Sequence, residues 1–134
     1  ECFHGFEDES GKVNEYSGSI PPASSGPAQL NLYIRNADGS AVTEFINNGS
    51  VNATPCFSPN GKQLVFTSNV GGEYDLYVVD VASQTVEKMT TSPGFDGDPL
   101  FVGDGSRLAF VSQRNDDDRS EINIFVADWV SSEE

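Results

Sequence analysis

Short apolar segments separated by polar turns make up most of the chain. Residues 63–68 have the apolar centre Leu64-Val65-Phe66, which is typical of a β-strand buried on both faces. Residues 74–80 are rich in β-branched and aromatic side chains and predict another strand. Residues 85–90 alternate between polar and apolar positions, as an edge strand does. No longer stretch has a helical period, so the pattern predicts an all-β protein of antiparallel strands.

A tight turn precedes these strands. Phe57 lies in an apolar segment that ends at Ser58-Pro59-Asn60-Gly61, where Asn-Gly is expected to supply the positive φ angles of a hairpin. With this first strand the unit has four short strands in about 40 residues, which is the size of a β-propeller blade.

The unit is repeated along the chain. Residues 55–68 align with residues 99–112 at an offset of 44, and Pro, Phe, Gly, Leu, Phe and Ser recur at the same places. Residues 31–34 match residues 75–78 at the same offset, and residues 123–126 follow at 48. Agreement in two separate registers indicates a tandem repeat.

These residues resemble a known repeat family. The aromatic-Ser-Pro-Asn-Gly turn after Phe57, the strand Leu64-Val65-Phe66-Thr67-Ser68 and the segment Asp75-Leu76-Tyr77-Val78-Val79-Asp80 resemble the TolB-type, WD-like β-propeller repeat. The second copy departs from the pattern, with Val102-Gly103 in place of Ser-Pro and Phe125 in place of Tyr. The resemblance implies the fold but no single function, because such blades serve in periplasmic scaffolds, peptidase propeller domains and some polysaccharide lyases.

The blades do not complete a propeller. The pattern gives the third and fourth strands of one blade (30–35 and 42–46), one full blade (55–90) and three strands of another (99–129). Together these make about two to two-and-a-half blades. A closed ring typically needs about four to eight blades. We therefore divide the chain into a partly extended N-terminal arm (1–28), the blade repeats (29–130) and an acidic tail (131–134). Within the arm, residues 12–20 alternate and predict one further strand.

Acidic residues exceed basic ones by a wide margin. Twenty-one Asp and Glu against seven Lys and Arg give a formal net charge of −14. Nucleic-acid binding is disfavoured, because it depends on Lys and Arg that replace the counterions of phosphates. Anionic membrane surfaces are disfavoured for the same reason. No apolar run approaches the ~20 residues that span a bilayer, so no membrane insertion is expected.

Several features predict a secreted, extracellular protein. The sequence starts at Glu1 rather than Met, which suggests a removed signal peptide. Cys2 and Cys56 are the two cysteines and are predicted to form a disulfide, although a buried free thiol at Cys56 is the alternative. Two sequons predict covalently attached glycans at Asn48 and Asn52. Chance occurrence is the alternative for both sequons.

The sequence offers little for catalysis or for a cofactor. The single histidine, His4, has no partners that would make a Ser-His-Asp arrangement, so we predict no enzyme and no catalytic residues. The run Asp116, Asp117 and Asp118 is a weak candidate for calcium, and Asp96 and Asp98 flank a glycine. Neither segment matches the spaced pattern of a calcium-binding loop, so solvated turns are the simpler interpretation. We expect no cofactor; calcium is the one ion that these carboxylates could bind.

Two functions remain open. The first is a non-enzymatic structural or assembly subunit whose partners are copies of itself, joined head to tail by β-strand complementation into a filament or ring. In that arrangement the arm or the strands 30–35 and 42–46 would pair with the open last blade, which ends after Trp129. The alternative is a fragment or small member of a propeller binding protein that recognises a glycan or protein ligand.

Overall fold

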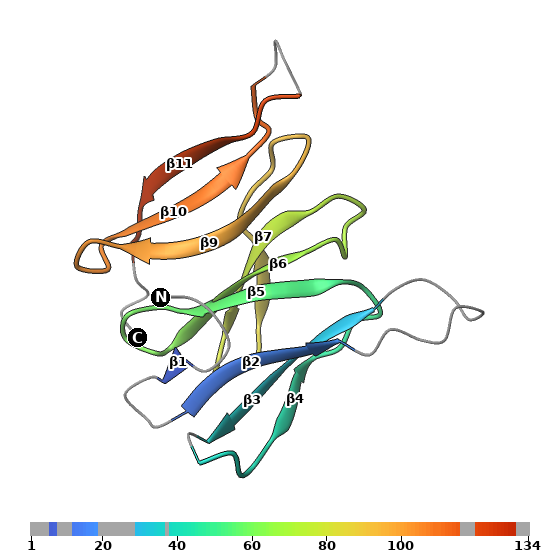
Figure 1. The fold of residues 1–134 in the computed structure, drawn as a ribbon, viewed down its shortest axis with the longest axis vertical. Coiled ribbons are helices and arrows are strands. Elements are labelled where there is room, and N and C mark those ends of the chain that lie inside the picture. Colours follow the sequence, from blue (N-terminus) through green and yellow to red (C-terminus); the bar gives the residue numbers. More distant parts are fainter. Residues whose placement is uncertain (1–5, 8–11, 19–28, 37, 116–119, 131–134) are drawn as a thin grey trace.

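The computed structural model describes residues 29–36, 38–115 and 120–130, together with the backbone of residues 6–7 and 12–18. Eleven strands in this part of the chain form three antiparallel sheets, which are stacked face to face (Figure 1). The predicted all-β propeller fold is confirmed. The described residues include no helix of the length and apolarity that a membrane span requires.

The first sheet includes the two described segments of the N-terminal arm. Its order is β1 (Phe6–Glu7), β2 (Lys12–Gly18), β3 (Leu30–Asn36) and β4 (Thr43–Ile46). β2 pairs along its whole length with β3, from Lys12 opposite Asn36 to Gly18 opposite Leu30. The arm and the two predicted outer strands are thus paired with each other within one chain.

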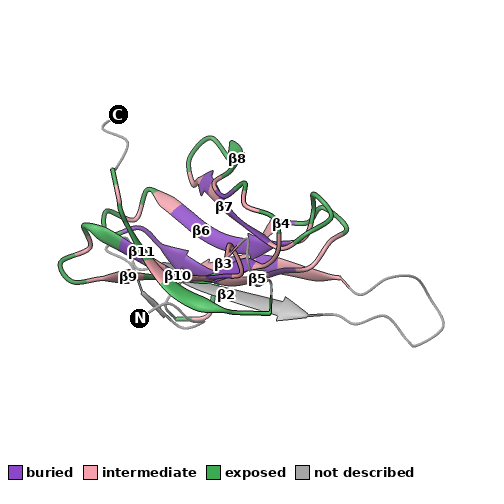
Figure 2. Cartoon of the chain, turned by 90° about the horizontal axis from the view of Figure 1, so that it is seen from above, coloured by how far each residue is buried: buried purple, intermediate pink, exposed green. Residues whose placement is uncertain are grey.

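The second sheet is the complete blade that the sequence predicts. It contains β5 (Asn52–Phe57), β6 (Gln63–Ser68), β7 (Asp75–Asp80) and β8 (Val86–Lys88) in that order. The bounds of β6 match the prediction, whereas β8 is shorter than the predicted 85–90. All three residues of β8 are exposed, so no burial fixes the ends of this strand (Figure 2).

The turn between β5 and β6 differs from the expectation. Of the Asn-Gly pair, only Gly61 takes a positive φ, of 72°. Asn60 instead closes the turn with its side chain, because its Oδ1 accepts hydrogen bonds from Ser58 Oγ (2.8 Å) and Lys62 N (2.9 Å). The prediction of two positive φ angles was therefore wrong, since a longer loop lets the Asn side chain bond its own backbone.

The third sheet has three strands, β9 (Asp96–Val102), β10 (Arg107–Ser112) and β11 (Asn123–Asp128). One register feature recurs in all three sheets, where a Ser at the end of the second strand opposes Asn or Asp at the start of the third. These pairs are Ser17–Asn31, Ser68–Asp75 and Ser112–Asn123. β2 therefore occupies the position of β6 and β10 in its own blade.

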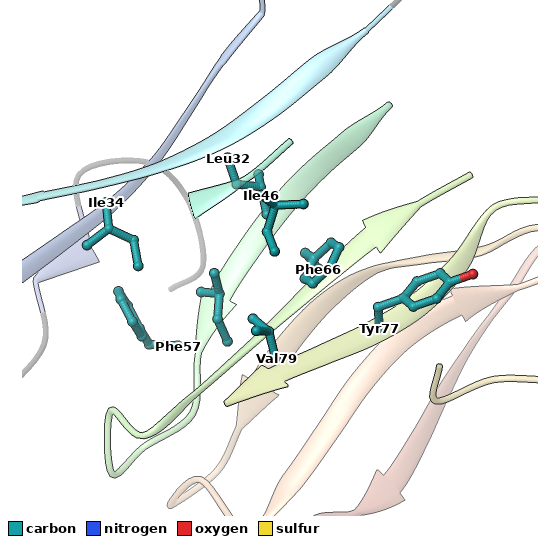
Figure 3. Packing of buried hydrophobic residues seen from close by; sticks show 8 residues of the cluster. Leu32, Ile34, Ile46, Phe57, Phe66, Tyr77 and Val79 are labelled. Carbon is teal, nitrogen blue, oxygen red and sulfur yellow. The ribbon is translucent and has the colours of Figure 1, made fainter. Parts of the chain in front are cut away.

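Two apolar layers join the blades. The layer between the first and second sheets contains Leu32, Ile34, Ile46, Phe57, Leu64, Phe66, Tyr77 and Val79 (Figure 3). The layer between the second and third sheets contains Val65, Leu76, Leu108 and Phe110, with Met89, Phe101, Phe125 and Trp129 packed against it. β6 contributes to both layers, which confirms that this strand is buried on both faces.

The second and third blades share a polar contact just before their first strands, β5 and β9. Val51 N donates a hydrogen bond to Asn69 Oδ1 (2.8 Å), and Phe95 N donates one to Gln113 Oε1 (2.9 Å). Backbone bonds return in the other direction, from Asn69 N to Val51 O and from Gln113 N to Phe95 O. The repeat therefore conserves polar contacts as well as its apolar faces.

Candidate blade-docking surface

The third blade has an open edge. β11 pairs with β10 on one side, and no other strand of the described residues pairs with its second side. Five of the six residues of β11 are exposed, in contrast to the buried residues of β6 and β7 (Figure 2). Unpaired N–H and C=O groups along such an edge favour the addition of a further strand.

The outward face of the same blade is apolar. Ile124 is 75% exposed and Val126 is 52% exposed on β11, and Leu100 of β9 is 39% exposed. Val126 lies opposite Ala109, which in turn lies opposite Leu100, so the three strands present one continuous apolar face. An exposed patch of this kind indicates an interaction site.

In the other two blades, the equivalent face packs against the next blade. At the offset of 48, Ile124 corresponds to Leu76 of the second blade, and Leu76 is 1% exposed because the third blade covers it. In the first blade the position is occupied by Leu32, which is 1% exposed beneath the second blade. The open face of the third blade is therefore built like two faces that another blade covers.

At the opposite end of the stack, the described side chains around Glu44 are polar. Leu32 and Ile34 point toward the second blade, so the alternate residues Asn31 and Tyr33 lie on the outward face of the first blade. Glu44 accepts hydrogen bonds there from Tyr33 Oη (3.2 Å), Asn31 Nδ2 (3.2 Å) and Asn47 Nδ2 (3.1 Å). The two ends of the described stack thus differ, with amides and a carboxylate at one end and apolar side chains at the other.

The two carboxylates that flank Gly97 lie in different environments. Asp96 is fully buried and lies 3.2 Å from Arg114 Nη2, and burial raises the pKa of Asp96 despite this contact. Asp98 is exposed, and its backbone N donates to Thr67 Oγ1 (3.1 Å). Within the described residues, no group of three or more His, Cys, Asp or Glu gathers around a common point. Asp116, Asp117 and Asp118 lie outside these residues.

The two sequon asparagines have different environments. Asn48 is exposed, whereas Asn52 is fully buried at the start of β5. Asn52 Nδ2 donates to Leu30 O (3.0 Å), Asn48 Oδ1 (2.9 Å) and Ser50 O (3.2 Å). Asn48 Nδ2 donates in turn to Asn52 Oδ1 (3.3 Å). A glycan on Asn52 would therefore displace more hydrogen bonds than one on Asn48, and glycosylation of either residue stays a prediction.

The predicted disulfide involves one described cysteine. Cys56 lies in β5 and is 2% exposed. Cys2 lies outside the described residues, as does His4, so the Cys2–Cys56 bond remains a prediction.

Comparisons with known proteins identify the repeat. The family described as the TolB β-propeller domain matches residues 23–128. The chain belongs to the TolB β-propeller family. A protein named as a TolB homolog from Chlorobium chlorochromatii is 25% identical over 146 residues, covering 78% of this chain and 33% of that protein.

Solved structures agree on the fold. TolB from Acinetobacter baumannii superposes with a TM-score of 0.74 at 19% identity, over 95% of this chain and 30% of that one. An acylaminoacyl peptidase from Pyrococcus horikoshii superposes with a TM-score of 0.60 at 17% identity, over 88% of this chain and 18% of that one. The chain spans about a third of the length of these two TolB proteins.

The sequence alone did not identify the exposed apolar face. The signal was present in the alignment of Ile124 with Leu76, but an apolar residue in a strand predicts burial whether or not a partner is present. The ion pair between buried Asp96 and half-buried Arg114 was also missed, because Arg114 lies outside the repeated motif.

Proposed function

We propose that this chain is a three-blade unit of a non-enzymatic propeller binding protein, and that its third blade binds a further blade of the same repeat. The observation that carries the proposal is the exposure of Ile124 and Val126, whose counterparts are covered by neighbouring blades. The open edge of β11 supports it, since a docked blade places further strands beside that edge. The match over only a third of the TolB relatives supports a larger ring.

The contacts of four described Asp carboxylates fit a binding role. Asp38 and Asp104 hold their own turns, Asp75 bonds Thr90 and Lys88, and Asp96 contacts Arg114. These contacts use the carboxylates to hold the fold, which favours a scaffold over general acid catalysis. We further propose that the protein is exported, on the basis of its predicted Cys2–Cys56 disulfide and its resemblance to repeats that serve in periplasmic scaffolds.

Matched substitutions test blade docking by light scattering. Val126 (52% exposed) lies on the open face, and Val42 (59% exposed) lies in the loop before β4. We expect the wild type and Val42→Asp to associate through the open faces of their third blades as concentration rises, and Val126→Asp to stay monomeric, because only the last variant places a charge on the open face. Equal masses for all three proteins at every concentration would refute the docking surface.

Head-to-tail assembly of copies is the second candidate, favoured by the open edge of β11. The arm is a poor donor, because β2 is fully paired with β3 of its own chain. A copy would have to place its polar first blade, with Asn31, Tyr33 and Glu44, on the apolar third blade. Continued growth of the scattering mass with concentration, beyond a closed ring, would favour the filament; one discrete mass would favour a ring.

A further inference from the structure

A small cavity lies between two neighbouring hairpins. It has a volume of about 280 Å³ and is lined by Pro59, Asn60, Asp104, Gly105, Ser106 and Trp129. The β5–β6 and β9–β10 hairpins that form it project at the same end of adjacent blades (Figure 1). The cavity is separate from the open face of the third blade.

The two hairpins fix the shape of this cavity. Gly105 has a φ of +91°, and a Cβ at this position would lie 2.4 Å from Cγ of Pro59. Only glycine allows this close approach and this backbone conformation together. Trp129 N donates to Ser106 O (2.8 Å), and the Trp129 ring packs edge to face with Phe101 at 5.0 Å. These contacts position the walls before any ligand arrives, which lowers the entropic cost of binding.

The polar lining provides an acceptor and a donor. Asp104 is exposed, and its Oδ1 accepts from Ser106 N (3.0 Å). Its hydrogen bonds with Ser106 lower the pKa of Asp104, so the carboxylate is ionised near neutral pH. Asn60 Oδ1 is occupied by Ser58 Oγ and Lys62 N, and no hydrogen bond within the described residues engages its Nδ2. A ligand therefore meets a carboxylate acceptor and an amide donor.

This combination fits a polar, uncharged ligand. Apolar ligands are usually bound in pockets lined mainly by hydrophobic side chains, whereas here Asn60, Asp104 and Ser106 alternate with Pro59 and Trp129. Sugar rings carry vicinal hydroxyls that both donate and accept, and their C–H faces pack against indole rings.

We propose that the cavity between the β5–β6 and β9–β10 hairpins binds one neutral sugar residue of a glycan. Asp104 accepts hydrogen bonds from ring hydroxyls, Asn60 donates to them, and Trp129 provides the packing surface. The proposal deepens the binding role proposed above but does not require a docked fourth blade.

Two isosteric substitutions reverse the polarity of the cavity and keep the turns. Asp104→Asn retains an oxygen for Ser106 N but replaces the second acceptor with a donor. Asn60→Asp retains the oxygen for Ser58 and Lys62 but replaces the donor with an acceptor. Asp38→Asn is the matched control, because Asp38 Oδ1 accepts from Ser40 N (2.8 Å) in an equivalent turn away from the cavity.

Fluorescence of Trp129, the only tryptophan, reports on the cavity directly. We expect titration of the wild type and of Asp38→Asn with glucose, galactose and N-acetylglucosamine to give a saturable change for at least one sugar. Asp104→Asn and Asn60→Asp should each weaken that binding about fivefold or more, as expected for a lost hydrogen bond to a charged or buried partner. Urea unfolding midpoints of both variants establish that they are folded.

Three results would overturn the proposal. The first is no saturable change with any of the sugars, by fluorescence or by saturation-transfer NMR. The second is unchanged affinity in both cavity variants. The third is a salt-sensitive response to arginine methyl ester alone, which would assign the cavity to cations. All titrations use one protein concentration below the onset of association, so a failure here leaves the light-scattering test of blade docking unaffected.

Discussion

The exposed face of the third blade makes a quantitative prediction about two equivalent residues. Leu76 and Ile124 occupy the same position of the repeat, but Leu76 is 1% exposed and Ile124 is 75% exposed. Truncation of a buried Leu to Ala removes about 2–5 kcal/mol of folding free energy. Full burial of an Ile side chain contributes about 1.5–3 kcal/mol, of which only a quarter applies to Ile124, so Ile124→Ala should cost about 0.5 kcal/mol.

Urea unfolding at low protein concentration measures this difference. Leu76→Ala should shift the midpoint strongly, whereas Ile124→Ala should leave it nearly unchanged. Repeating the measurement at high concentration adds a second readout, because an Ile124 that becomes covered by another blade should then contribute more. If both truncations cost the same at low concentration, Ile124 is covered within the monomer and the open face does not exist.

Three further predictions concern residues away from that face. Asn52→Ala should lower the free energy of unfolding by about 2 kcal/mol through loss of its buried hydrogen bonds, and exposed Asn48→Ala by less than about 1 kcal/mol, as measured by urea unfolding. Peptide mass spectrometry without reduction should find Cys2 linked to Cys56, and reduction should cost about 4 kcal/mol; two free thiols would contradict the bond. Hydrogen bonds with Ser40 and Ser106 lower the pKa values of Asp38 and Asp104, so the stabilisation from each carboxylate is present above its unfolded pKa and is lost as pH falls through its folded pKa. Replacing both with Asn should therefore flatten the acid side of the stability profile.

Strong burial made parts of the fold predictable. β6 was found at its correct bounds because Leu64 and Phe66 face one blade and Val65 faces the next. The short edge strand β8 was overextended, because none of its residues is buried and the alternation continues beyond the paired residues.

The N-terminal arm was harder to interpret from the sequence, because β2 lacks the apolar centre that β6 has. Residues 13–16 read Val-Asn-Glu-Tyr where β6 has Leu-Val-Phe-Thr, so a comparison by residue type does not align them. The pairing of Ser17 with Asn31 restores the register shared with Ser68 and Asp75. A search for that polar pair, rather than for apolar residues, would have placed the arm in the first blade.

The site was the least predictable part, because a sequence pattern reports the kind of face and not whether that face is covered. Each apolar layer between blades uses one face from each of two sheets. Three sheets with two such layers leave one face at either end. The face on the first blade is closed by a hydrogen-bonded network around Glu44, and the face on the third blade presents Ile124 and Val126. Burying the Glu44 network beneath an apolar blade would cost its solvation without new partners, whereas covering Ile124 removes apolar surface from water. This contrast supports the proposal that a further blade docks on the third blade.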